Sequence, residues 1–368
     1  MSTKKDKFSL KDKFYMEIAL KLANSRQGLT GTNPSVGCVI VKNDKIVSIG
    51  QTSYNGRPHA EFNAIENCID DLNGSKMYVT LEPCCHHGLT PPCTNIIIKS
   101  KISEVIYSVS DIDKRVRNKS LKILKSNKIK VKKGLLDDKI NNFYSNYFFN
   151  RKNQLPYVTG KIAVSKNNLI YSKLNKKITN RHSDKFTHLL RYKNDALMVT
   201  YKTLNNDNSK LNCRIKGFSN FSPKRIILDN KLQTKINTYV IDTANKNNTL
   251  IFYNQAKKSK ILEFKNKKIQ LIKSKINQQG KFDIKAILKK LYTHNCRNLL
   301  IEGGDSLTSH LLKNKIFNRF YLYKSPKNIP KETEYLKFNS LDVLKKNYKN
   351  KFNLNLYLGK DKITLYKN

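Results

Sequence analysis

The chain has 368 residues, with 71 Lys and Arg against 27 Asp and Glu, which gives a formal net charge of +44. This length is about twice that of a common domain, so we expect two domains that each bury a core of their own. The sequence holds no apolar run long enough to cross a bilayer, and Met1 to Lys7 lead into no apolar signal core, so we expect a cytoplasmic protein with no membrane partner.

The positive charge is spread along the whole chain instead of being gathered in one arm. It accompanies many Asn, Ile and Tyr residues, a bias typical of an A/T-rich genome. Such a charge attracts anionic substrates and cofactors, but its even distribution leads us to expect no specific nucleic-acid partner.

The 7 cysteines are an odd number and are scattered through the chain, which favours reduced thiols over a disulfide framework. Four of them lie among apolar neighbours and are expected to be small buried hydrophobes, namely Cys38, Cys68, Cys213 and Cys296. Metal binding or catalysis is the expected use of the others.

Helices and strands alternate in the first half of the chain. Helical spacing of apolar residues predicts an amphipathic helix over about 11–25, and two short apolar runs at 36–41 and 46–49 predict a strand hairpin. Further strands are predicted at 77–81, 104–109 and 129–132, with helices starting after His59 and near Cys93 and over about 117–126 and 137–149. This order predicts a mostly parallel sheet with helices on both faces.

A polar stretch at 149–154 precedes Pro156 and predicts a domain boundary, giving domains over 1–150 and 151–368. The second half again alternates, with strands predicted at 157–164, 196–200, 225–228, near Tyr239 and near Leu250, and at 299–301. Helices are predicted around Phe186 to Leu190 and over about 283–293. We therefore expect a second α/β domain.

The residues that carry chemistry gather around two short motifs in the first half. His59 and Glu61 occupy the first turn of a predicted helix, Cys84 follows a strand, and Cys93 begins another helix. One imidazole and two thiols with an open fourth position make a catalytic zinc site, so we predict His59, Cys84 and Cys93 as ligands of one zinc ion per chain. Glu61 is the predicted proton shuttle.

The alternatives are a closed zinc knot that uses Cys85, His86 or His87, or no metal at all. Neither explains a carboxylate two residues after His59.

Eight residues separate Cys84 from Cys93, whereas short-loop deaminases have only two between these cysteines. This loop resembles the corresponding loop of the bifunctional deaminase–reductase family of riboflavin biosynthesis. Two further segments resemble motifs of the same family, namely Asn33-Pro34-Ser35-Val36-Gly37-Cys38-Val39 and Pro58-His59-Ala60-Glu61. The resemblance implies a cytidine-deaminase-like three-layer α/β/α domain, which deaminates a diaminohydroxy-phosphoribosylamino-pyrimidine. It also implies a dihydrofolate-reductase-like α/β domain, which reduces the ribosyl group to a ribityl chain with NADPH.

The resemblance extends to short segments of the second half, including Lys161-Ile162-Ala163-Val164-Ser165 and Glu302-Gly303-Gly304. Glycines after a buried strand let backbone N–H groups approach a pyrophosphate, and arginines bind phosphate bidentately. The implied substrate-binding residues are Asn33, Arg191, Leu211, Arg214 and Glu302. The implied cofactor-binding residues are Ala163, Lys177, Thr203, Asp207, Asn230, Gly304, Asp305, Ser306, Leu307, Thr308, Ser309 and His310.

The chain departs from the family pattern at several positions. Leu89 stands where the family has a basic residue and Thr52 where it has a histidine, so neither brings the charge expected to meet the substrate's phosphate. In the second half Asn167-Asn168 replaces Asp-Gly, Asn208-Ser209 replaces Asp-Pro, and Lys177 replaces a tryptophan. These departures leave open a deaminase with an inactive reductase domain, and the charge leaves open an RNA-base deaminase. A homo-oligomer is one assembly that the sequence permits.

Overall fold

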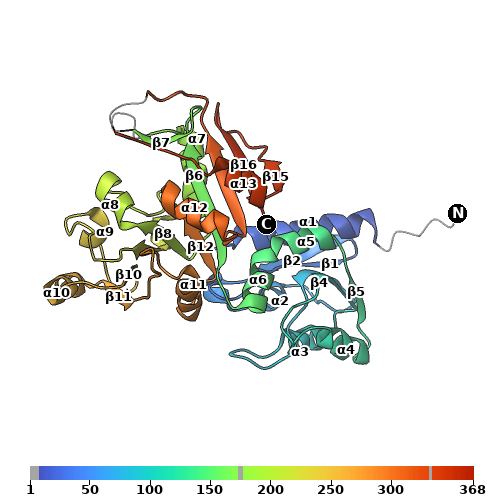
Figure 1. Ribbon diagram of the computed structural model, residues 1–368. Helices are drawn as coiled ribbons and strands as arrows, with labels where there is room; N and C mark the ends of the chain where they lie inside the picture. Colours follow the sequence, from blue (N-terminus) through green and yellow to red (C-terminus); the bar gives the residue numbers. More distant parts are fainter. Residues whose placement is uncertain (1–7, 173–176, 331–333) are drawn as a thin grey trace. The chain divides into compact units, whose positions relative to one another are not determined.

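The computed structural model describes residues 8–172, 177–330 and 334–368, and the chain forms two compact units, Met1–Gln154 and Leu155–Asn368 (Figure 1). The boundary expected at residue 150 falls inside helix α6 (Ser145–Asn153). Asn150 is buried there, so the polar stretch belongs to a packed helix and not to a linker.

The first unit is built on a five-stranded sheet in the order β2-β1-β3-β4-β5. Its strands are β1 (Gly37–Lys42), β2 (Lys45–Gln51), β3 (Lys76–Leu81), β4 (Glu104–Val109) and β5 (Lys130–Lys133). The predicted hairpin of β1 and β2 is confirmed, with Asn43 and Asp44 at positive φ in its two-residue turn. The sheet has fewer parallel strand pairs than predicted. β1 also runs antiparallel to β3, and in this sheet only β3, β4 and β5 run parallel to one another.

Two glycines show how helices lie against both faces of this sheet. A Cβ on Gly37 would be 1.9 Å from the carbonyl oxygen of Ala19 in α1 (Leu10–Ser25), and one on Gly50 would be 2.1 Å from that of Ala60 in α2 (Ala60–Glu66). Gly50 pairs with Cys38, the neighbour of Gly37, so the two glycines point to opposite faces. The helices α1 and α2 therefore cover opposite faces, and the predicted three-layer α/β/α arrangement is confirmed.

The remaining helices of the first unit are α3 (Cys93–Lys99), α4 (Lys119–Ser126) and α5 (Asp137–Phe143), with a short 3-10 turn η1 (Tyr54–Gly56). The helix predicted over 137–149 is divided at Tyr144 into α5 and α6. The buried Tyr144 hydroxyl bonds to Thr80 Oγ1 at 2.6 Å and to the carbonyl oxygen of Ser35 at 3.0 Å, which anchors this corner to the sheet.

The second unit contains a nine-stranded sheet in the order β11-β10-β9-β8-β12-β6-β13-β16-β15. All neighbours from β11 to β13 run parallel, and β16 and β15 extend this edge antiparallel. The strands are β6 (Tyr157–Val164), β8 (Ala196–Thr200), β9 (Lys224–Leu228), β10 (Thr249–Tyr253), β11 (Gln270–Lys273), β12 (Asn298–Ile301), β13 (Arg319–Lys324), β15 (Asn350–Asn353) and β16 (Lys362–Lys367). A separate pair joins β7 (Leu169–Ser172) to β14 (Tyr335–Lys337).

Alternate residues of these strands pack into two different hydrophobic cores, one on each face, as expected for a sheet that is covered on both faces. Ala196 and Met198 pack with α11 (Ile284–Thr293), α12 (Asp305–Lys313) and α13 (Leu341–Asn347). Leu197 and Val199 pack with α7 (Arg181–Tyr192), α8 (Tyr201–Asp207), α9 (Tyr239–Asp242) and α10 (Lys258–Asn266). The predicted second α/β domain is confirmed.

The strand predicted near Tyr239 is wrong, because these residues form the short helix α9. Val240 and Ile241 are both buried, and an apolar pair of this kind fits either a strand or a short helical turn. The carbonyl oxygen of Thr238 accepts a hydrogen bond from Ile241 N at 2.9 Å, which closes the turn. The second unit also has a 3-10 turn, η2 (Ser219–Phe221).

Within the described residues, no helix has the length and apolar character needed to cross a membrane.

Candidate active sites

The predicted metal ligands His59, Cys84 and Cys93 meet at one point, where their ligand atoms all lie within 4.8 Å of one another. His59 Nδ1 is 3.5 Å from Cys84 Sγ and 3.4 Å from Cys93 Sγ. Ligands of tetrahedral zinc, with bonds of ~2.1 Å to nitrogen and ~2.3 Å to sulfur, lie roughly 3.5–3.8 Å apart. The donor set and its spacing therefore fit zinc.

Each ligand comes from the end of a regular element. His59 is the residue before α2, Cys93 is the first residue of α3, and Cys84 follows β3 by three residues. Thr94 N donates a hydrogen bond to the carbonyl oxygen of Cys84 at 3.1 Å, which holds the two ends of the intervening loop together. A rigid scaffold thus aims three side chains at one point.

The two thiols already interact with each other and with the imidazole. Cys93 N donates to Cys84 Sγ at 3.3 Å. The Cys93 side chain and His59 lower the pKa of the Cys84 thiol, outweighing the opposite effect of burial. The site therefore favours a thiolate at Cys84, the form that binds metal.

Glu61, the predicted proton shuttle, is buried in the first turn of α2 and lines the same cavity as His59 and Cys84. Burial raises the pKa of its carboxyl group to about 7. A carboxyl group with such a pKa both accepts and releases a proton near neutral pH, as a shuttle requires.

The predicted pyrimidine-binding residue Asn33 also lines this cavity. Its Nδ2 donates to the carbonyl oxygen of Gly56 at 3.1 Å, which fixes the orientation of the amide. Three arginines that were not predicted line the cavity as well, namely Arg57, Arg115 and Arg151. Of these, only Arg57 lies close in sequence to a motif.

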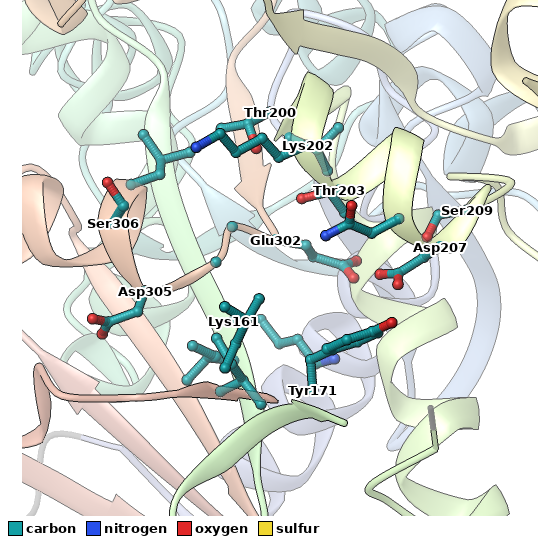
Figure 2. A pocket seen from close by; sticks show the side chains of 18 of the residues that line it. Lys161, Tyr171, Thr200, Lys202, Thr203, Asp207, Ser209, Glu302, Asp305 and Ser306 are labelled. Carbon is teal, nitrogen blue, oxygen red and sulfur yellow. The ribbon is translucent and has the colours of Figure 1, made fainter. Parts of the chain in front are cut away.

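The second unit has a partly open cavity of about 1120 Å³, bordered by the carboxyl ends of β8, β9 and β12. Figure 2 shows Thr203 and Asp207 of α8 across this space from Asp305 and Ser306 at the start of α12, with Glu302 between them. Ligands commonly bind at such strand ends in parallel sheets. The predicted residues that line the cavity are Ala163, Lys177, Arg191, Thr203, Asp207, Leu211, Asn230, Glu302, Gly304, Asp305, Ser306, Leu307 and His310.

Three predicted residues do not line this cavity. Arg214 is exposed and its guanidinium donates to Asn212 Oδ1 at 3.0 Å. Thr308 is buried within α12, with its hydroxyl bonded to the carbonyl oxygen of Gly303 at 3.3 Å, and Ser309 follows it in the helix.

Two predicted substrate residues form an ion pair in the cavity wall. Arg191 Nε is 2.7 Å from Glu302 Oε1 and its Nη2 is 2.9 Å from Oε2, with both side chains largely buried. Burial alone would raise the pKa of Glu302, but the charge and hydrogen bonds of Arg191 hold it at about 2. The carboxylate is therefore ionised and has a fixed orientation.

Lys161 also lines the cavity, whereas its sequence context predicts only a place in a strand. Its ammonium lies 4.9 Å from the centre of the Tyr323 ring. Burial lowers the pKa of Lys161, while the charge of Glu302 opposes that effect. The signal available in the sequence was a lysine inside the mostly apolar run 157–164.

Asn167 and Asn168, which depart from the family pattern of Asp-Gly, form a turn between β6 and β7, in which Asn168 N donates to the carbonyl oxygen of Ser165 at 3.0 Å. Asn168 has a φ of 62°, in the left-handed region that glycine favours and asparagine tolerates. Asn167 Oδ1 accepts hydrogen bonds from Ser165 Oγ at 2.7 Å and Ile329 N at 3.1 Å. The two asparagines thus form a hydrogen-bonded turn without a glycine.

Comparison with known families defines the class of protein. The family model described as the cytidine and deoxycytidylate deaminase zinc-binding region matches residues 9–109, which contain all three zinc-ligand candidates. The model described as the RibD C-terminal domain matches residues 160–345, which contain the large cavity. The fold and the two sites thus define a zinc-binding deaminase joined to a reductase.

The riboflavin biosynthesis protein RibD of Aquifex aeolicus is 33% identical to this chain, over 86% of the chain and 87% of the relative. That of Actinobacillus pleuropneumoniae is 34% identical, over 87% and 85%. The chain belongs to the RibD family.

Solved structures agree with this assignment. A diaminohydroxyphosphoribosylaminopyrimidine deaminase/5-amino-6-(5-phosphoribosylamino)uracil reductase from Thermotoga maritima superposes with a TM-score of 0.81 at 27% identity, over 97% of this chain and 98% of its own. Acinetobacter baumannii RibD superposes with a TM-score of 0.82 at 24% identity over the same shares and shows the same fold.

Proposed function

We propose that this chain carries out two successive steps of riboflavin synthesis. The first unit, Met1–Gln154, hydrolytically deaminates a diaminohydroxy-phosphoribosylamino-pyrimidine, and the second unit, Leu155–Asn368, reduces the ribosyl group of the product to a ribityl chain with NADPH. The observation that carries the proposal is the buried Glu61 carboxyl beside the His59, Cys84 and Cys93 set.

In the deamination, water replaces the exocyclic amino group of the pyrimidine and ammonia leaves. Zinc held by His59, Cys84 and Cys93 would supply a hydroxide at neutral pH by lowering the pKa of bound water to ~7. Glu61 takes up the proton of the attacking water and delivers it to the departing nitrogen. Asn33, oriented by Gly56, is the proposed pyrimidine ligand.

In the reduction, the nicotinamide supplies the hydride and the protein orients cofactor and substrate. The Glu302 carboxylate, fixed by Arg191, is proposed to bind the ribose hydroxyl groups of the substrate. The turn at Gly303-Gly304 and the start of α12 are proposed to bind the cofactor, where backbone N–H groups meet its phosphates.

A coupled assay tests both steps in one tube, by following ammonia release and NADPH oxidation on the phosphorylated pyrimidine. We expect ammonia first and NADPH oxidation after it. Accumulation of the deaminated intermediate with NADPH present would contradict the reductase half, and absence of ammonia would contradict the deaminase half. Deamination of a base in RNA would instead favour a nucleic-acid substrate.

The cytoplasm is the proposed location. It is supported by the seven cysteines, which are all outside disulfides, as suits a reducing compartment.

A further inference from the structure

We propose that Arg57 recognises the phosphate group of the pyrimidine substrate at the deaminase site. The inference rests on the proposed function, because that substrate carries a phosphate. Arg57 lies between the turn η1 and His59, and it lines the same cavity as His59 and Glu61.

The Arg57 side chain reaches across the cavity wall to the loop between the two cysteine ligands. Its Nη1 donates a hydrogen bond to Thr90 Oγ1, and its Nη2 lies 3.5 Å from the position that a Cβ on Gly88 would occupy. The guanidinium therefore brings a permanent positive charge to the loop that borders the zinc-ligand set.

This loop has no cation of the lysine or arginine type, since residues 85–92 read Cys-His-His-Gly-Leu-Thr-Pro-Pro. Leu89 has 90% of its surface exposed, and its side chain carries no charge that could attract a ligand. Thr52, which lines the cavity, is buried, and its hydroxyl accepts a hydrogen bond from Val36 N at 2.9 Å. Neither position at which the family has a basic side chain brings a positive charge to a phosphate here.

The two other arginines that line the cavity already contact an acidic or an aromatic side chain. Arg115 binds Asp113 bidentately, with its Nε 3.0 Å from Oδ1 and its Nη2 2.6 Å from Oδ2. Arg151 stacks over the Tyr147 ring at 5.4 Å. Within the described residues Arg57 has no carboxylate at ion-pair distance, so its charge is available to an anion.

Gly88 leaves space beside the guanidinium that a larger residue would fill. His86 lines the same cavity, and its Nε2 lies 4.0 Å from the same Cβ position on Gly88. A phosphate resting on Gly88 would thus meet a guanidinium fork and an imidazole, while the pyrimidine ring extends toward Asn33 and Glu61.

The test compares the KM and kcat of ammonia release for the phosphorylated pyrimidine and for its dephosphorylated form. Arg57→Gln should raise the KM for the phosphorylated substrate ~10- to 100-fold, the loss of one charge-assisted hydrogen-bonded contact, with kcat nearly unchanged. The KM for the dephosphorylated substrate should stay as in the wild type. Arg57→Lys should recover part of the loss, because it keeps the charge but not the fork.

Arg117→Gln is the matched control, since it removes one exposed positive charge of the same unit outside the cavity. It should leave both KM values unchanged. Zinc content equal to that of the wild type establishes that Arg57→Gln leaves the ligand set intact.

Two further measurements complete the test. Ribose 5-phosphate should inhibit ammonia release by the wild type more strongly than ribose does, and Arg57→Gln should abolish that difference. Adding Leu89→Lys to Arg57→Gln should restore low KM, because it returns a cation to the same loop. An unchanged KM in Arg57→Gln, with normal wild-type ammonia release, would overturn the role of Arg57 alone; no wild-type ammonia release would overturn the proposed function itself.

Discussion

Among single residues, Glu61 combines deep burial with a raised pKa beside three metal ligands. Glu61→Gln keeps the shape of the side chain but cannot carry a proton. We expect ammonia release to fall ~10²- to 10⁴-fold, the usual contribution of general acid–base catalysis, with normal zinc content. Steady-state ammonia release and metal analysis check this result. Undiminished turnover in the folded variant would remove Glu61 from the proposed mechanism.

The Arg191–Glu302 pair gives a second prediction at this scale. Glu302→Gln leaves the largely buried Arg191 charge without its carboxylate, so the free energy of unfolding of the second unit should fall by ~3 kcal/mol at pH 7. Lys267→Gln, which breaks the exposed pair with Asp242, should cost under ~1 kcal/mol and serves as the control. Urea unfolding measures both differences.

The pH dependence of the Glu302 effect follows from its pKa. The folded value of about 2 lies below the ~4.3 of an unfolded glutamate, so the carboxylate contributes stability above pH ~4.3 and loses it as the pH falls toward 2. The stability difference between wild type and Glu302→Gln should therefore be constant near neutrality and narrow in acid. A difference that widened below pH 4 would contradict this assignment.

At the scale of single elements, the packing of α2 against β2 at Gly50 positions the side chains of His59 and Glu61. A methyl group on Gly50 would lie 2.1 Å from the carbonyl oxygen of Ala60, so Gly50→Ala must push α2 away from β2. The shift moves His59 and Glu61 together. We expect ~1–3 kcal/mol of destabilisation and at least ~10²-fold slower ammonia release, with reduced zinc content.

Ile49→Ala is the control for Gly50→Ala, because the Ile49 side chain is 46% exposed on the adjacent strand position. Zinc analysis and ammonia release should stay near wild-type values in this variant. NADPH oxidation on the deaminated intermediate should be normal in both variants, and its loss in Gly50→Ala would mean that the whole chain had misfolded.

The sequence predicted the elements whose residues have a clear period or a metal-ligand spacing. The strands around Val39 and Val79 and the three zinc ligands are of this kind. It could not distinguish a short apolar helix from a strand at Tyr239, because two buried neighbours fit both. The sequence did not predict Arg57, because its role depends on Thr90, which lies 33 residues further along the chain, and on Gly88, and no local period marks such a contact.

For the whole molecule, the three zinc-ligand candidates lie in Met1–Gln154 and the large cavity is lined by residues of Leu155–Asn368. Removing zinc with a chelator should therefore abolish ammonia release while NADPH oxidation on the deaminated intermediate continues. Restored ammonia release after zinc addition is the control. A parallel loss of both activities would show that the metal also supports the reductase.

The place of β6 in its sheet also bears on how the chain is synthesised. This strand follows the unit boundary at once, yet it pairs with β12 and β13, and Val158 N donates to Asn318 Oδ1 across 160 residues of sequence. The first unit has its hairpin and its metal ligands before residue 100. On the ribosome the three metal ligands of the deaminase are thus synthesised early, whereas β6 has no partner strand until β12 and β13 have followed, and an unpaired strand of this kind is exposed to aggregation during that interval.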